Sequence, residues 1–236
     1  MKILICLLFH TLILANDSRS LYALLCYDTI SNVKGATYND QKHIHEALWT
    51  INKELQAHIT IKTLQGQALT SKRLSKTMKK TPKSDMLLFY FSGHGFRPEI
   101  SSLLFPYIIL PAKHERYSAE LICRQLEHSA CLVLLIFDCC NCSRPPPEFL
   151  RTKSLSPSLP GLYSLFNKQG SVIFIGAVPG TPSLAYSNGS LFTTVFLNTL
   201  LFSCQNEHVS WEDIYEKTAQ LCLLKDQKPL CFINLK

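Results

Sequence analysis

The sequence predicts an α/β protein whose central sheet is mostly parallel and carries helices on both faces. Segments with strand character alternate with segments of helical character along the chain of 236 residues. Two of the strand segments, LLFYFS and LVLLIFD, are almost continuously apolar. A strand without a polar face is buried on both faces, as in parallel sheets that helices cover. With 47% hydrophobic and 17% charged residues, the composition fits one compact domain with a large core.

Strands and helices are expected in alternation. The strands are short apolar segments, and we place them at residues 21–27, 59–64, 85–92, 131–138, 171–177 and 230–234. The first helix is expected to be amphipathic, and the helices are placed at residues 40–56, 70–80, 119–127, 191–203 and 211–224. A strand, helix, strand order that repeats along the chain is the pattern that builds a parallel sheet.

Residues 1–15 have the pattern of an export signal. A positively charged start, Met1-Lys2, precedes the apolar run ILICLLFHTLIL, and the small residue Ala15 follows before a polar stretch. The run is too short for a comfortable membrane span. We therefore expect cleavage near Ala15, no stable span afterwards, and an exported or secreted domain over residues 16–236. The alternative is a cytoplasmic protein in which residues 1–15 form a first core strand.

The formal charge of +7 raises the question of an acidic partner. Basic residues cluster in one segment, at Lys72, Arg73, Lys76, Lys79, Lys80 and Lys83. No aromatic residue stands between them, so this segment lacks the stacking surface that single-stranded nucleic acid uses. We therefore interpret the cluster as a solvated helix face and expect no nucleic-acid partner.

Ten cysteines in an exported protein would ordinarily suggest disulfides. Most of them stand inside apolar runs, such as Cys26 in ALLCY and Cys131 in ACLVLLIF. We interpret them as small buried hydrophobic residues rather than a disulfide framework, and their redox state stays open.

Two of the apolar strands end abruptly at residues that carry chemistry. The strand at 85–92 is followed by His94, which stands between two glycines in the sequence SGHG. The strand at 131–138 runs into the sequence DCCNC. Because the carboxyl ends of parallel strands meet at one edge of the sheet, where ligands bind, we expect a histidine and a cysteine together there.

A cysteine beside a histidine can perform nucleophilic catalysis. The thiolate attacks, and an imidazole within hydrogen-bond reach withdraws the thiol proton and later protonates a departing amine. Side chains alternate along an extended strand end, so Asp138 and Cys140 share a side while Cys139 points away. We therefore predict Cys140 as the nucleophile and His94 as the base. The backbone N–H groups of Gly95 and Cys140 are candidate donors to an oxyanion, since the glycines let the backbone approach a substrate.

With these motifs the chain resembles the caspase-like cysteine peptidases, particularly their metacaspase branch. YFSGHG resembles the histidine motif of the family, and DCCNCS resembles its Asp-x-Cys-His-Ser-Gly cysteine motif. The likeness extends to QALTSKRLSKTMKKTPKSDMLLFYFSGHG and GSLFTTVFLNTL, and it covers roughly residues 21–233. It implies a caspase-like three-layer sandwich and a cysteine-type endopeptidase that acts on peptide or protein substrates.

The same resemblance implies a preference for basic residues. A carboxylate beside a thiol disfavours the thiolate, so Asp138 is better suited to substrate binding. In metacaspases the matching aspartate resembles the floor of a pocket for arginine or lysine before the scissile bond, aided by an acid near the first helix. Asp40 is the candidate for that second acid. Asp40 also fits a helix capping box with Thr37, and the two roles are compatible.

The chain departs from the family pattern at several positions. Asn141 replaces a histidine, Cys142 replaces a serine and Ser143 replaces a glycine. The acidic loop expected after the histidine motif is not recognisable in RPEISSLLFPYIILPAK. No cofactor is required for the chemistry, and calcium activation is left without support.

Two other kinds of function are considered. A catalytically silent caspase-like interaction module is expected to have lost His94 or Cys140, and both are present. A metal site built from Cys139, Cys140 and Cys142, with His94, lacks the separated CxxC pairs that usually hold structural zinc. We therefore expect no metal.

The segment NCSRPPPEFLRTKSLSPSLPGLY, residues 141–163, is predicted to be an exposed loop. It is rich in proline and serine and has no apolar periodicity. Its place in the chain resembles the linker that caspase-like enzymes cut during maturation. Arg151 and Lys153 are the candidate autoprocessing sites, whereas Arg144 is followed by proline and is a poor one. The alternative is a solvated loop without a processing role.

Overall fold

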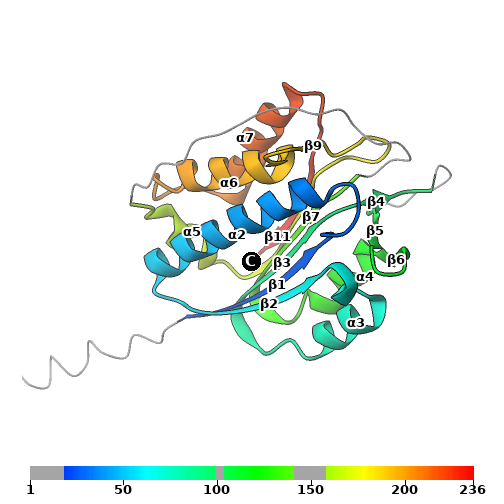
Figure 1. Cartoon of the computed structure of the whole chain (residues 1–236). Coiled ribbons are helices and arrows are strands. Elements are labelled where there is room, and N and C mark those ends of the chain that lie inside the picture. Colours follow the sequence, from blue (N-terminus) through cyan, green and yellow to red (C-terminus); the bar gives the residue numbers. More distant parts are fainter. Residues whose placement is uncertain (1–18, 99–103, 141–157) are drawn as a thin grey trace, which may run out of the picture.

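The centre of the protein is a single twisted sheet, seen in a computed structural model that describes residues 19–98, 104–140 and 158–236. Its strand order is β11-β8-β7-β3-β1-β2. The strands are β1 (Ser20–Tyr27), β2 (His58–Gln65), β3 (Ser84–Ser92), β7 (Ala130–Asp138), β8 (Gly170–Ile175) and β11 (Leu230–Leu235). Neighbouring strands run parallel except β11, which is antiparallel to β8. The predicted α/β class with a mostly parallel sheet is confirmed (Figure 1).

Helices cover both faces of this sheet and make the molecule three-layered. One face carries α2 (Lys34–Leu55), α5 (Gly161–Phe166), α6 (Leu191–Ser203) and α7 (Trp211–Leu223). The other face carries α3 (Ser71–Lys79) and α4 (Ala119–Leu126), as Figure 1 shows. Each helical layer buries its apolar residues against the sheet in its own hydrophobic cluster. The sheet is therefore sealed from water on both sides over most of its area.

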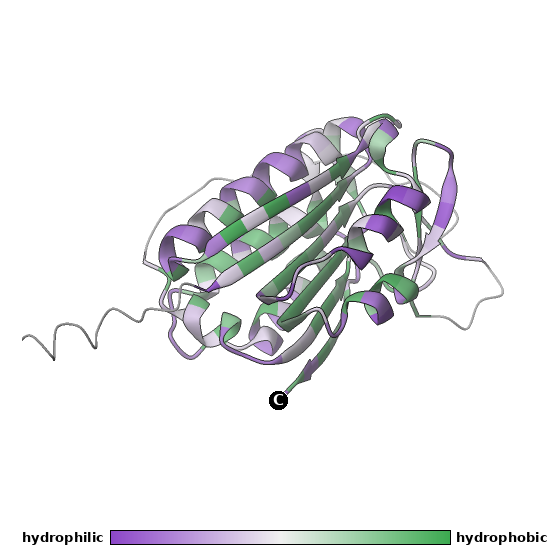
Figure 2. Ribbon diagram, turned by 90° about the horizontal axis from the view of Figure 1, so that it is seen from below, coloured by the Kyte–Doolittle hydropathy of each residue, from purple (hydrophilic) through white to green (hydrophobic). Residues whose placement is uncertain are grey.

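The alternation of side chains explains why the central strands are apolar throughout. In β3, Leu88 and Tyr90 pack under α2 and α6, whereas Phe89 and Phe91 pack under α3 and α4. Successive residues of a strand point to opposite faces of the sheet. When helices cover both faces, every side chain of the strand is buried and an apolar residue is favoured at each position. Figure 2 shows apolar residues running along the central strands. This is the burial that the sequence predicts.

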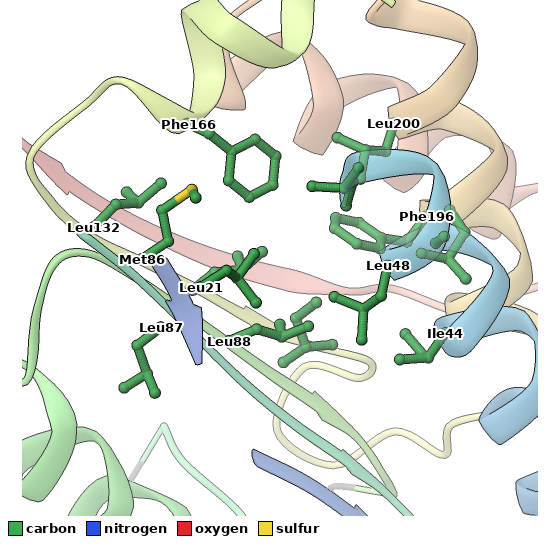
Figure 3. A pocket seen from close by; sticks show the side chains of 15 residues that line it. Leu21, Ile44, Leu48, Met86, Leu87, Leu88, Leu132, Phe166, Phe196 and Leu200 are labelled. Carbon is green, nitrogen blue, oxygen red and sulfur yellow. The ribbon is translucent and has the colours of Figure 1, made fainter. Parts of the chain in front are cut away.

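A small apolar cavity lies between α2, α6 and the sheet. Its volume is about 30 Å³, and Leu48 from α2, Leu88 from β3 and Phe196 from α6 are among its lining side chains (Figure 3). A water molecule needs polar partners as well as space. Because the lining is almost entirely hydrocarbon, we interpret the cavity as a dry packing gap in the core rather than a binding site.

Short strands near the edge of the main sheet were not predicted from the sequence. They form a three-stranded sheet of β4 (Gly95–Phe96), β5 (Tyr107–Leu110) and β6 (Glu115–Ser118), and a hairpin of β9 (Ala185–Tyr186) and β10 (Gly189–Ser190). The remaining element is the 3₁₀ turn η1 (Gly66–Ala68). The short strands frame the end of the sheet where β3 and β7 finish.

The first helix begins earlier than predicted, and this corrects the capping-box interpretation of Thr37 and Asp40. Its N-cap is Val33, which makes no side-chain cap. Thr37 lies inside the helix, and its Oγ1 donates 2.7 Å to the carbonyl oxygen of Asp28. Asp40 lies further inside and is fully buried. The helix starts early because tertiary contacts of this kind hold its first turns, which the sequence alone does not reveal.

Two smaller expectations also need correction. Cys131 is exposed rather than buried, because it stands at the start of β7 where the strand enters the sheet. The predicted exposed loop at 141–163 ends earlier than expected, since Leu159 is buried and α5 begins at Gly161. Among the described residues no helix is long and apolar enough to cross a membrane. The predicted signal at residues 1–15 lies outside the described part of the chain, as do Arg151 and Lys153.

Candidate active site

The carboxyl ends of β3 and β7 meet at the centre of one sheet edge. The two strands are parallel neighbours, and their last residues, Ser92 and Asp138, are partners in the register. The turn that follows β3 is tied to β7, because the Gly93 N–H donates 3.2 Å to the Asp138 carbonyl oxygen. His94 and Cys140 each stand two residues beyond a strand end. The juxtaposition expected from the two motifs is therefore present.

Both residues line a cleft of about 720 Å³. Asp138 and Ser190 contribute to its wall, together with the loop that follows β1. The cleft is open to solvent at the carboxyl edge of the sheet, which is where parallel sheets place their ligands.

The two adjacent cysteines have different surroundings. Cys140 is half-buried in the cleft, and its Sγ lies 3.5 Å from the Ser183 carbonyl oxygen. Cys139 is 1% exposed and packs in the hydrophobic cluster under α3 and α4. Burial raises the pKa of the Cys139 thiol well above its ordinary value, so this thiol stays protonated. The alternation predicted for the strand end is observed, and of these two thiols the one on Cys140 is partly exposed.

His94 has a partner that was not predicted from the sequence. Its Nε2 lies 2.7 Å from Oδ1 of Asn32, which belongs to the loop between β1 and α2. β1 is the neighbour of β3, so this loop emerges at the same sheet edge as His94. In the sequence, Asn32 is recognisable only as a polar residue after a strand end. Many loop residues have this property, so it does not single out Asn32 as the partner of His94.

The glycines on either side of His94 allow the backbone to pack closely. A Cβ atom on Gly95 would lie 2.1 Å from the Cys140 carbonyl oxygen and 2.7 Å from Sγ of Cys139. A Cβ atom on Gly93 would lie 2.7 Å from Cβ of Asp28. Real Cβ atoms are not found this close to a carbonyl oxygen, so the segments carrying His94 and Cys140 approach each other only because residue 95 has no side chain.

Asp138 is a buried carboxylate in a shell of hydroxyl and amide donors. It is 3% exposed and accepts hydrogen bonds from Ser183 Oγ at 2.7 Å and from Thr193 Oγ1 at 2.6 Å. The backbone N–H of Thr193, at the start of α6, donates at 3.1 Å. α6 and the loop after β8 thus hold the carboxylate at the wall of the cleft.

Asp40 lies one layer deeper. It is fully buried and accepts from Ser92 Oγ at 2.6 Å and from the Ser190 N–H at 2.7 Å, with Ser190 Oγ as a third donor. Ser190 itself lines the cleft, so it separates Asp40 from the open space. The two predicted pocket acids are therefore brought together, Asp138 at the wall and Asp40 behind it.

The pKa values of these two acids are shifted in the same direction. Burial, followed by the charge of Asp138, raises the pKa of Asp40 to about 7. Burial also raises the pKa of Asp138. None of the ion pairs formed by the described residues includes either carboxylate. Two adjacent buried acids without a cation beside them hold a proton more tightly than exposed acids do.

The described residues contain no group of three or more His, Cys, Asp and Glu side chains that could hold a metal ion. In the alternative metal site, Cys139 is buried in a hydrophobic cluster, whereas Cys140 is partly exposed in the cleft that both residues line. Cys142 lies outside the described residues, as do Asn141 and Ser143.

Comparison with known proteins agrees with this architecture. A family profile described as the caspase domain matches residues 21–229. Among solved structures, caspase-1 from Spodoptera frugiperda aligns with a TM-score of 0.62 at 16% identity, over 94% of this chain and 92% of that one. A protein from Geobacter sulfurreducens aligns with a TM-score of 0.58 at 16% identity, over 91% and 92% of the two chains. No curated protein sequence matches the chain significantly.

Proposed function

The chain belongs to the caspase domain family, and from this we propose that it is a cysteine endopeptidase that cleaves after arginine or lysine. Members of the family are cysteine peptidases. The observation that carries the proposal is the meeting of two strand ends. β3 brings His94 and β7 brings Cys140 to one cleft, beside a buried pair of carboxylates.

In the proposed reaction His94 takes the proton of the Cys140 thiol, and the resulting thiolate attacks the scissile carbonyl carbon. The tetrahedral intermediate collapses as the imidazolium gives its proton to the leaving amine, which leaves a thioester on Cys140. His94 then takes a proton from water, and the hydroxide attacks the thioester. Release of the carboxylic acid returns the proton to the sulfur and regenerates the dyad.

Oxyanion stabilisation is assigned to the backbone N–H groups of Gly95 and Cys140. The close packing of these two segments supports the assignment, because both backbones border the space beside the Cys140 sulfur. Donors held by a rigid backbone need no reorganisation as negative charge develops on the carbonyl oxygen.

Specificity for a basic residue is assigned to Asp138, with Asp40 behind it. Both acids already accept several hydrogen bonds, so they are held in place before a substrate arrives. A guanidinium or ammonium group would supply the cation that the pair lacks among the described residues. An aspartate side chain in the same pocket would place another negative charge beside the acidic pair, and it should be rejected.

Hydrolysis of fluorogenic peptides that differ only in the residue before the bond tests this proposal. Wild type is expected to cleave arginine and lysine peptides in preference to aspartate peptides. Cys140→Ala and His94→Ala should abolish cleavage, whereas Cys139→Ala should retain it because that thiol faces the core. Equal loss in Cys139→Ala would overturn the assignment of the nucleophile. A folded chain that cleaves none of the peptides would favour the silent interaction module.

The same specificity makes Arg151 and Lys153 the proposed autoprocessing sites. Cleavage there would release fragments beginning at Thr152 or Ser154. Intact-mass measurement of wild type beside Cys140→Ala decides the question, with cutting expected in wild type alone. Autoprocessing would be contradicted if wild type cleaves peptides but stays intact, or if the inactive variant is cut to the same extent.

A further inference from the structure

The loop between β1 and α2 reaches across to the imidazole of His94. Asn32 is an exposed residue of this loop, and its Oδ1 lies 2.7 Å from Nε2 of His94. Both residues line the cleft that contains Cys140. An amide oxygen can only accept a hydrogen bond, so the contact requires the proton of a neutral imidazole to sit on Nε2. The other nitrogen, Nδ1, then carries the free lone pair.

The loop that presents Asn32 is held by a buried carboxylate. Asp28 is 1% exposed and accepts hydrogen bonds from Ser31 Oγ at 2.7 Å, from the Ser31 N–H at 3.1 Å and from the Ile30 N–H at 3.4 Å. The loop closes on itself through the Lys34 N–H, which donates 3.1 Å to the Ser31 carbonyl oxygen. Residues 28–34 therefore form a compact turn in which the position of Asn32 is fixed, even though its side chain is exposed.

The same turn is tied to the strand that His94 follows. The Asp28 N–H donates 3.0 Å to the carbonyl oxygen of Ser92, the last residue of β3. Asp28 also packs against Gly93 so closely that a side chain there would collide with it. Asp28 thus contacts both the turn that carries Asn32 and the segment that carries His94. The contact between Asn32 and His94 is formed without any movement of the loop over the site.

We propose that Asn32 is a positioning residue that holds His94 in the Nε2–H tautomer and presents Nδ1 as the nitrogen that exchanges a proton with Cys140. The inference rests on the proposed function, in which His94 is the base. As the S–H bond of Cys140 breaks, an N–H bond forms at Nδ1, and the imidazolium carries a proton on each nitrogen. Asn32 Oδ1 accepts the Nε2–H before and after this transfer, so the contact survives the whole cycle.

The test uses the full-length protein with three substitutions. Asn32→Ala removes the acceptor, Asn32→Asp replaces the amide oxygen with a carboxylate oxygen, and Ile30→Ala is the control in the same turn. Ile30 is 43% exposed and has no side-chain hydrogen-bonding group. Peptide hydrolysis against pH is measured for each protein. Nitrogen-15 NMR of the His94 ring reports the tautomer, and the rate of Cys140 alkylation by iodoacetamide against pH reports the thiolate.

Wild type and Ile30→Ala should show the Nε2–H tautomer. Asn32→Ala should show a mixture of tautomers and lose at least about tenfold in kcat with little change in KM, because the base is misoriented while the pocket is intact. Asn32→Asp should recover most of kcat and move the alkaline limb of the profile to higher pH, since a carboxylate stabilises the imidazolium.

Two results would overturn the inference. One is an Asn32→Ala protein with the wild-type tautomer and alkylation profile, which would mean that other groups orient His94. The other is an Asn32→Asp protein whose profile does not move. If wild type hydrolyses no peptide, the proposed function fails, while the NMR and alkylation measurements still decide whether Asn32 orients His94.

Discussion

At the scale of single residues, the most consequential group outside the proposed dyad is Asp40. Its pKa is raised from 3.8 to about 7, first by burial and then by Asp138. The folded protein therefore binds a proton that the unfolded chain releases between about pH 4 and pH 7. This contribution to stability is fully present below the unfolded pKa and is lost as pH rises through the folded one.

Asp40→Asn is expected to weaken this dependence, and the part that comes from the buried Asp138 should remain. The variant should be more stable than wild type above about pH 8, while the difference between the two should shrink or reverse near pH 5. Chemical denaturation of both proteins across this range measures it. A wild type that gains stability relative to Asp40→Asn as pH rises would show that the buried acid is already ionised and well compensated.

Gly95 is the residue whose substitution should separate activity from folding. A methyl group there would overlap the carbonyl oxygen of Cys140, so one of the two segments must move. Because misplacement of a reacting group by about 1 Å can cost 100-fold in rate, Gly95→Ala should lose at least that much peptidase activity. Circular dichroism should show a folded protein. Full activity in a folded Gly95→Ala protein would contradict the close approach of the two segments.

At the scale of the elements, the packing of α2 against the sheet contributes to the free energy of unfolding. Leu48 is 2% exposed and borders the cavity of Figure 3, so Leu48→Ala would enlarge an existing gap. We expect a loss of about 3 kcal/mol in the free energy of unfolding. Ile61 on β2 is 40% exposed, and Ile61→Ala should cost less than about 1 kcal/mol. Equal losses in denaturant titrations would mean that the packing around Leu48 collapses to fill the gap.

The elements differ in how well the sequence predicts them. β3 and β7 were predictable because both of their faces are buried, which leaves a continuous apolar run. β4, β9 and β10 are two residues long and carry no periodicity that could reveal them. The first turns of α2 contain Gly35 and lack a side-chain cap, so only tertiary contacts reveal them as helical.

The residues of the candidate site also differ in whether the sequence predicts them. His94 and Cys140 follow strand ends and belong to recognisable motifs, so the sequence was enough to place them together. Asp138 and Asp40 came from the family resemblance, and the structure brings them together. Asn32 stands in an ordinary loop sequence, and its position beside His94 depends on β1 lying next to β3. Contacts created by sheet order are the part that local sequence does not encode.

At the scale of the whole molecule, the site is a product of sheet order. β1, β3, β7 and β8 are consecutive neighbours, and all four run parallel. The chain after each of them contributes one group: Asn32 after β1, His94 after β3, Cys140 after β7 and Ser183 after β8. The loops that follow parallel strands lie at the same edge of the sheet, so four segments that are distant in the sequence meet there.

The proposed function requires Cys140 and His94 to form a working dyad beside a pocket for a basic side chain. Short peptidyl acyloxymethyl ketones, identical except for arginine or aspartate next to the reactive group, test it directly when the labelled residue is located by mass spectrometry. Cys139 and the exposed Cys131 serve as internal controls. We expect labelling of Cys140 by the arginine reagent, weak labelling by the aspartate reagent, and loss of labelling in His94→Ala. Preferential reaction with the aspartate reagent, or labelling of Cys131 in place of Cys140, would contradict it.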